Sequence, residues 1–147
     1  MALREVSVSR TIPAPAAAIF AVLADPSKHP LIDGSGSVRD LRPGSAARLG
    51  PGSKFSMDMR IVVPYRVTNT VVEFEEGRLI AWRHFGGHRW RWRLEPAGDA
   101  TTATETFDWS TAISPRFIER RGYPERNRAS MVATLERLER LVCDKPE

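Results

Sequence analysis

Three polar residues stand where strand-like alternation otherwise places apolar side chains. Glu105 falls in step with Ala103 and Phe107, His84 with the apolar residues that precede it, and Asn69 with a third apolar series. Because alternate residues of a strand share one face, we expect these three side chains to point toward the core. A buried polar group destabilises the fold unless it is hydrogen-bonded, so each needs a protein partner, a water or a ligand.

Glu105 and His84 have the chemistry of a general acid–base pair. An apolar pocket raises the pKa of a carboxyl group, and a histidine titrates near neutral pH. A structural interpretation stays open beside the catalytic one. In it, His84 lies half in solvent at a strand end near Gly86-Gly87, and Glu105 pairs with an arginine of a neighbouring strand.

Large aromatic and methionine side chains share the inward phases with the polar residues. Tryptophans and flexible methionines line wide ligand pockets, and they also fill ordinary cores, so both interpretations are open. With the polar residues included, the candidate ligand-binding set is Met57, Met59, Asn69, Trp82, His84, Trp90, Trp92, Glu105, Phe107 and Trp109.

Other kinds of site find less support in the sequence. The run from Arg89 to Arg93 alternates arginine with tryptophan, which puts guanidinium groups and indoles on opposite faces of a strand. Phosphate contacts and base stacking would then not occur on one surface, as a nucleic-acid site requires. None of the three histidines stands at a metal-ligand spacing from another or from Cys143. Gly34-Ser35-Gly36 lacks the length and the lysine of a phosphate-binding loop. We expect no metal, no cofactor and no nucleic-acid partner.

Seven strands and two helices are predicted to position these residues. Short turn-like connections between most of the strands predict an antiparallel meander. The first helix spans Ala14–Ala24, and the second begins at Ser114-Pro115 and is interrupted at Gly122-Tyr123-Pro124. The predicted strands are Glu5–Ile12, Val38–Arg42, Lys54–Ile61, Tyr65–Glu75, Arg78–Phe85, Arg89–Glu95 and Thr101–Ser110. The apolar face of the last helix is expected to carry Met131, Leu135, Leu138 and Val142.

The length and composition of the chain predict a single folded domain over residues 1–147. Apolar residues make up 41% and charged residues 27%, as in globular proteins. Cys143 is the only cysteine, so an internal disulfide is impossible, and a reducing compartment fits best. The first ten residues lack an apolar run of signal-peptide length, and no later stretch is long and apolar enough to span a membrane. We expect a cytoplasmic protein, monomeric or homodimeric.

Several segments of the chain resemble the START-like (SRPBCC) superfamily, and within it bacterial proteins labelled polyketide cyclase/dehydrase. The resemblance rests on Ile12-Pro13-Ala14-Pro15, Leu23-Ala24-Asp25-Pro26, Ile32-Asp33-Gly34-Ser35-Gly36, Ile80-Ala81-Trp82 and the stretch from Asn127 to Glu139. It implies an α+β helix-grip fold, in which a seven-stranded curved antiparallel sheet wraps around a long C-terminal helix. A deep pocket is left between the sheet and the helix. This favours the pocket interpretation of the aromatic set.

Three functions are compatible with this resemblance, because the fold does not determine the activity. The first is a carrier or sensor that binds a small hydrophobic molecule, polyketide-like, aromatic or lipidic, between sheet and helix. The second is a polyketide aromatase/cyclase or dehydratase that uses His84 and Glu105. The third is a protein-interaction module akin to chaperone co-factors, which would expose an apolar patch. Residues 122–124 could form a lid over the pocket.

Overall fold

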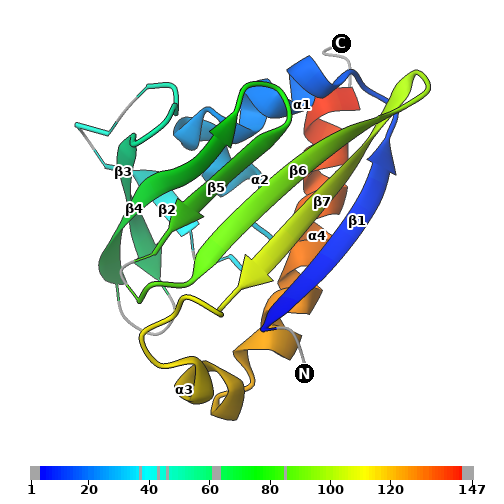
Figure 1. The fold of residues 1–147 in the computed structure, drawn as a ribbon. Coiled ribbons are helices and arrows are strands. Elements are labelled where there is room, and N and C mark those ends of the chain that lie inside the picture. The colour runs from blue at the N-terminus through cyan, green and yellow to red at the C-terminus, as the bar shows by residue number, and fades with distance from the viewer. Residues whose placement is uncertain are drawn as a thin grey trace.

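Seven strands and a long C-terminal helix account for most of the computed structural model, which describes residues 4–36, 38–42, 44–45, 47–60, 64–84 and 86–143 (Figure 1). The strands are β1 (Glu5–Ile12), β2 (Val38–Leu41), β3 (Lys54–Arg60), β4 (Pro64–Glu75), β5 (Leu79–Arg83), β6 (Arg89–Ala97) and β7 (Ala100–Asp108). The helices are α1 (Ala16–Leu23), the 3₁₀ turn η1 (Pro26–Lys28), α2 (His29–Ile32), α3 (Pro115–Arg120) and α4 (Tyr123–Cys143).

All seven strands form one antiparallel sheet in the order β1-β7-β6-β5-β4-β3-β2. Strands β2 to β7 are paired in chain order, and β1 joins the sheet beside β7. Figure 1 shows the sheet curving around α4, which packs on β1 and β7, while α1 and α2 cover the other end of the same face. The expected helix-grip fold is confirmed.

The ends of several elements differ from the sequence prediction by one or two residues. Strand β7 ends at Asp108, because the Asp108 carboxylate accepts hydrogen bonds from the backbone N–H and the hydroxyl of Ser110 and turns the chain there. Strand β5 ends at Arg83, one residue before His84. Gly122, with φ of 71°, separates α3 from α4 as predicted. Ile61 and Phe85, which end two predicted strands, lie outside the described residues.

Two apolar clusters, not one, fill the concave face of the sheet. The large cluster lies under α1, α2 and the C-terminal half of α4, and the small cluster lies beside α3 and the start of α4. The small cluster consists of Phe107, Trp109, Ile118 and Met131, with Trp90 and Tyr123 packed against it. The large cluster includes Ile19, Phe20, Leu23, Phe55, Met57, Ile80, Trp92, Leu94, Leu135 and Leu138. The division places a boundary across the middle of the concave face.

A network of ion pairs lies on the convex face of the central strands. Glu73 of β4 pairs with Arg89 and Arg91 of β6, each at 2.8 Å, and Arg91 also pairs with Asp108 of β7 at 3.1 Å. The network crosses β5 above the small side chain of Ala81, which it helps to bury. Hydrogen bonds from Arg91 hold the pKa of Glu73 at about 2, below its ordinary 4.5. The expected outward direction of these arginines is confirmed.

The segment after α2 approaches α4 most closely at Gly34. A Cβ atom at this position would lie 2.7 Å from the Cβ of Ala133 and 2.8 Å from the backbone nitrogen of Thr134. The Gly34 N–H donates to the Thr134 hydroxyl at 2.9 Å. Glycine is therefore required here by the packing distance between two backbones.

We predict that Gly34→Ala lowers the free energy of unfolding by about 1–3 kcal/mol, because the added methyl must push the segment off α4. Gly50→Ala is the matched control, since the nearest atom to its new Cβ would be 4.0 Å away. Urea unfolding followed by circular dichroism measures both. Equal stability of the two variants would contradict the assigned role of Gly34.

Candidate functional site

Glu105 lies on the concave face of β7, at the boundary between the two apolar clusters. Its cross-strand neighbours are Val8 of β1 and Trp92 of β6. Trp92 belongs to the large cluster, whereas Phe107, two residues further along β7, belongs to the small one. The Glu105 side chain is only 7% exposed, and Oε1 is buried with no hydrogen-bond partner among the described residues. The Glu105 Oε1 atom is thus buried without the hydrogen bond that it could form with another group.

The surroundings of Glu105 favour its protonated form. Burial raises the pKa of the carboxyl group well above its ordinary value, and the negative charge of Asp33 raises it further. The predicted alternative, an ion pair with an arginine, is not found within the described part of the chain. Arg10 of the neighbouring β1 pairs instead with Glu139 of α4, at 3.0 Å. Burial without an ion-pair partner therefore favours the neutral form of Glu105, which can donate a hydrogen bond.

His84 stacks on a second histidine, His88. Their ring centroids are 4.6 Å apart with 20° between the planes, and the His88 ring meets the edge of Phe107 at 5.4 Å. Burial lowers the pKa of each histidine to about 4, so both rings are neutral at physiological pH. The Nδ1 atom of His88 is buried without a hydrogen-bond partner among the residues described. The sequence-based prediction of site residues did not include His88, although strand alternation places it on the same face as Trp90 and Trp92.

The strand register separates Glu105 from His84. Phe107, Trp90 and Trp82 oppose one another on β7, β6 and β5 and form the row next to Glu105. His84 lies two residues beyond Trp82, on the far side of that row. The two residues predicted as an acid–base pair are therefore divided by aromatic rings, and each has its own neighbours.

Aromatic rings continue from His88 across the small cluster. Phe107 lies 4.9 Å from Trp90 and 5.5 Å from Trp109, measured between ring centroids. The indole N–H of Trp109 donates to Glu119 of α3 at 2.8 Å. The predicted residues Trp90, Phe107 and Trp109 thus form one wall at this end of the concave face.

The remaining predicted aromatic and methionine residues belong to the large cluster. The Trp82 ring stacks on His29 at 4.9 Å and meets the edge of Phe55 at 5.5 Å. Met57 and Trp92 are fully buried members of the cluster, and Met59 packs against it. For Met57 and Trp92 in particular, these contacts are those of ordinary core packing.

Polar groups also lie between the sheet and the beginning of α4. Asn69 of β4 is only 6% exposed, and none of the side-chain hydrogen bonds among the described residues involves it. Partial burial raises the pKa of Tyr65, and the charge of Arg126 opposes that shift, while Tyr123 and Asp33 add to it. The Arg126 guanidinium lies 4.6 Å from the Tyr123 ring centroid. Tyr65 is 37% exposed, and the partly buried Tyr123 packs against the small cluster.

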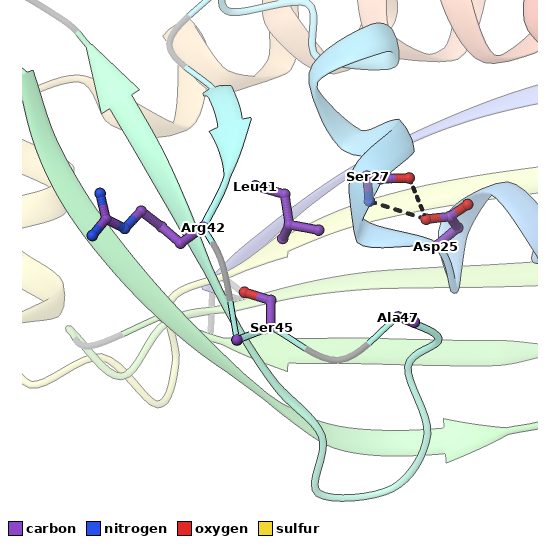
Figure 2. Close-up of a pocket in the computed structure, with 7 residues that line it drawn as sticks. Asp25, Ser27, Leu41, Arg42, Ser45 and Ala47 are labelled. Carbon is purple, nitrogen blue, oxygen red and sulfur yellow. Dashed lines mark hydrogen bonds between the residues drawn. The ribbon is translucent and has the colours of Figure 1, made fainter.

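An open pocket of about 550 Å³ lies elsewhere, between the α1–η1 junction and the segment after β2 (Figure 2). Figure 2 shows Asp25 directed toward Ser27, whose backbone N–H and hydroxyl both donate to the Asp25 carboxylate. Arg42 pairs with Asp58 at 3.2 Å. The lining residues are Asp25, Ser27, Leu41, Arg42, Gly44, Ser45 and Ala47, none of which was predicted to bind a ligand.

Within the described ranges, no three His, Cys, Asp or Glu side chains are grouped so that they could hold a metal ion. No helix of that part of the chain is both long and apolar enough to cross a membrane.

We predict that Glu105→Gln is more stable than the wild type at pH 8, by at least about 1 kcal/mol, because one pKa unit corresponds to about 1.4 kcal/mol. A carboxyl group with a raised pKa in the folded state stabilises the protein fully below its ordinary pKa of 4.5, and this stabilisation is lost as the pH rises. Free energies of unfolding from pH 5 to 8 test this, with the exposed Glu95→Gln as control. Parallel curves for wild type and Glu105→Gln would refute it.

Comparison with known proteins agrees with the fold. Protein Rv0088 of Mycobacterium tuberculosis is 42% identical over 139 residues, covering 90% of this chain and 62% of the relative. The chain therefore spans less than two thirds of the length of the curated relatives that it matches. Among solved structures, protein CV1439 from Chromobacterium violaceum has a TM-score of 0.73 at 14% identity. The match covers 97% of this chain and 99% of the CV1439 chain. The AHSA1-like protein from Aeromonas hydrophila has a TM-score of 0.69 at 19% identity, and the match covers 94% of this chain and 91% of that protein's chain.

The solved structures share the fold only, since their sequence identity is low. The model of the family described as polyketide cyclase/dehydrase and lipid transport matches residues 4–142, which is nearly the whole chain. That match agrees with the START-like resemblance of the sequence and with the helix-grip architecture. The chain belongs to the polyketide cyclase/dehydrase and lipid transport family.

Proposed function

We propose that the protein binds a small, largely apolar molecule between the concave face of the sheet and α4, with Glu105 as the polar anchor. The observation that carries the proposal is the buried carboxyl group with an unpartnered oxygen between two apolar clusters. Leaving a buried polar atom without a hydrogen bond costs about 1–3 kcal/mol, which a ligand at this position would recover.

The side chains around Glu105 suit a ligand with flat or ring-shaped apolar parts. Phe107 and Trp90 border it on one side, and the His84–His88 stack extends the wall. Aromatic rings pack against one another at centroid distances of about 4.5–7 Å, and ligand rings can join such a wall. Apolar linings with a few polar groups are the usual composition of small-molecule sites.

The protonation state of Glu105 limits which ligands are compatible. A protonated carboxyl group donates a hydrogen bond, so its partner is an acceptor such as a carbonyl oxygen. A ligand carboxylate at the same place would be less favourable, because Asp33 already contributes negative charge nearby. We therefore favour a neutral ligand that carries an acceptor oxygen.

A second candidate function is catalysis of a cyclisation or dehydration, with Glu105 as general acid. The burial of Glu105 is the observation that favours it, because burial raises the pKa of the carboxyl group and an acid must hold its proton at working pH to transfer it. His84 lies beyond the aromatic row, so Glu105 would act without His84 as a direct partner. The family description includes both cyclases and lipid transport, so it is compatible with either candidate.

The entrance is proposed to lie beside Tyr123, at the start of α4. Gly122 precedes Tyr123 with a positive φ, and the break between α3 and α4 provides a place where Tyr123 can move. Phe117 of α3 meets the Tyr123 ring at 6.2 Å. In this proposal, residues 122–124 act as the lid.

We predict that Glu105→Leu weakens the binding of Nile red, a neutral apolar dye with a carbonyl acceptor, by about tenfold, which is the loss of one hydrogen bond. Glu105→Gln should bind as the wild type does, because an amide N–H also donates. Fluorescence titration measures the affinities, and Leu141→Ala, on an exposed position of α4, is the control. Equal affinity of Glu105→Leu and wild type would remove Glu105 from the site.

Native mass spectrometry of the purified protein, followed by extraction, identifies a ligand that co-purifies. The extracted compound then separates the two candidate functions. Glu105→Gln can hold a ligand but cannot transfer a proton, so an enzyme would lose turnover in this variant while keeping its affinity. A carrier would show no turnover in either protein.

We predict that Tyr123→Ala speeds both the association and the dissociation of Nile red and leaves the equilibrium affinity within about threefold, because a lid changes rates more than affinity. Stopped-flow fluorescence measures both rates. Leu141→Ala again serves as control. Unchanged rates in Tyr123→Ala would show that entry does not pass this residue.

A further inference from the structure

The end of the molecule formed by α3 exposes large apolar side chains. Ile113, just before α3, is 84% exposed, and Phe117, one helical turn later, is 53% exposed. Their neighbour Ile118 faces inward and belongs to the small cluster. Figure 1 shows α3 at one end of the molecule, opposite α1 and the C-terminus. Ile113 and Phe117 thus contribute nothing to the core.

The same segment of the chain is rich in arginine. Between Ile113 and Arg128 the sequence contains five arginines and two glutamates. The Arg121 guanidinium lies 5.8 Å from the centroid of the Phe117 ring. One of the two glutamates, Glu119, is already paired with Arg4 and accepts the indole N–H of Trp109. This segment therefore combines exposed apolar side chains with an excess of positive charge.

The exposed segment is held in place by the neighbouring loop. The Ile113 N–H donates to the Gly86 carbonyl at 2.9 Å, and the Thr111 hydroxyl donates to the Gly87 carbonyl at 2.6 Å. A Cβ atom on Gly87 would lie 2.6 Å from the Thr111 carbonyl oxygen, so the two loops are in close contact. Ile113 is therefore fixed in an exposed position by its backbone.

We propose that this surface, Ile113 and Phe117 with Arg116, Arg120 and Arg121, docks on the headgroup region of an anionic lipid bilayer. Apolar side chains on a basic amphipathic segment enter the boundary between headgroups and acyl chains, and the arginines pair with lipid phosphates. Arginine is suited to this because its guanidinium forms paired hydrogen bonds with phosphate oxygens.

Other occupants fit the surface less well. A second copy would bring one arginine-rich surface against another, which like-charge repulsion opposes. Nucleic acid would use flat rings for stacking, whereas Ile113, the most exposed apolar residue, is aliphatic. A protein partner normally buries about 800 Å² on each side, far more than two side chains supply.

Co-sedimentation of the full chain with lipid vesicles tests the proposal. We expect binding to vesicles of phosphatidylcholine mixed with phosphatidylglycerol, and little binding to phosphatidylcholine alone. Ile113→Ser combined with Phe117→Ala should lower the partition coefficient by about tenfold, in line with the apolar area lost. Arg120→Glu combined with Arg121→Glu should lower it at least as much. Leu141→Ala and Arg140→Glu, on exposed positions of α4, should bind as the wild type does.

Thermal melts of each variant exclude unfolding as the cause of any loss. The proposal is overturned if the wild type does not bind the mixed vesicles, or if it binds both kinds of vesicle equally. It is also overturned if the arginine variants lose binding but the apolar variant does not, because simple attraction of a basic surface would then suffice. Loss of a dimer in the apolar variant, measured by sedimentation equilibrium, would reassign the surface to contact between copies.

Discussion

The structure depends on the packing of α4 against one face of a strongly curved sheet. The sheet has a single apolar face, and α4, with the short helices α1 and α2, supplies the apolar surface that covers it. The distance between α4 and the segment after α2 is set by a glycine, Gly34, which allows two backbones to meet. Curvature, helix position and this one contact together determine how much of the concave face is filled by protein side chains.

That packing leaves the concave face divided, and the division explains the unusual environment of Glu105. A carboxyl group between two apolar clusters lowers the stability of the folded protein at neutral pH, so it is the kind of residue retained for function. Asn69 lies on the same face, and its buried side chain likewise forms no hydrogen bond with the described residues. Glu105 and Asn69 are thus two buried polar side chains on a face that is otherwise mostly apolar.

The two faces of the sheet carry different chemistry because β6 alternates arginine with tryptophan. Arg89 and Arg91 join the network with Glu73 on the convex face, while Trp90 and Trp92 face α4. Strand geometry alone therefore keeps the two arginines Arg89 and Arg91 off the concave face. The arginines in and next to α3 are a separate group, on a segment outside the sheet that also carries exposed apolar side chains.

The sequence by itself determined the strands, the long C-terminal helix, the break at Gly122 and the inward direction of Asn69 and Glu105. These follow from period-two and helical spacing and from local turn chemistry, which act over a few residues. Only the tertiary structure decided that His84 stacks on His88, that an aromatic row separates His84 from Glu105, and that Glu105 has no arginine partner in the described part of the chain. Alternation specifies which face a side chain occupies, but the register between strands and the position of α4 specify which side chains meet, and both depend on contacts between residues far apart in the chain.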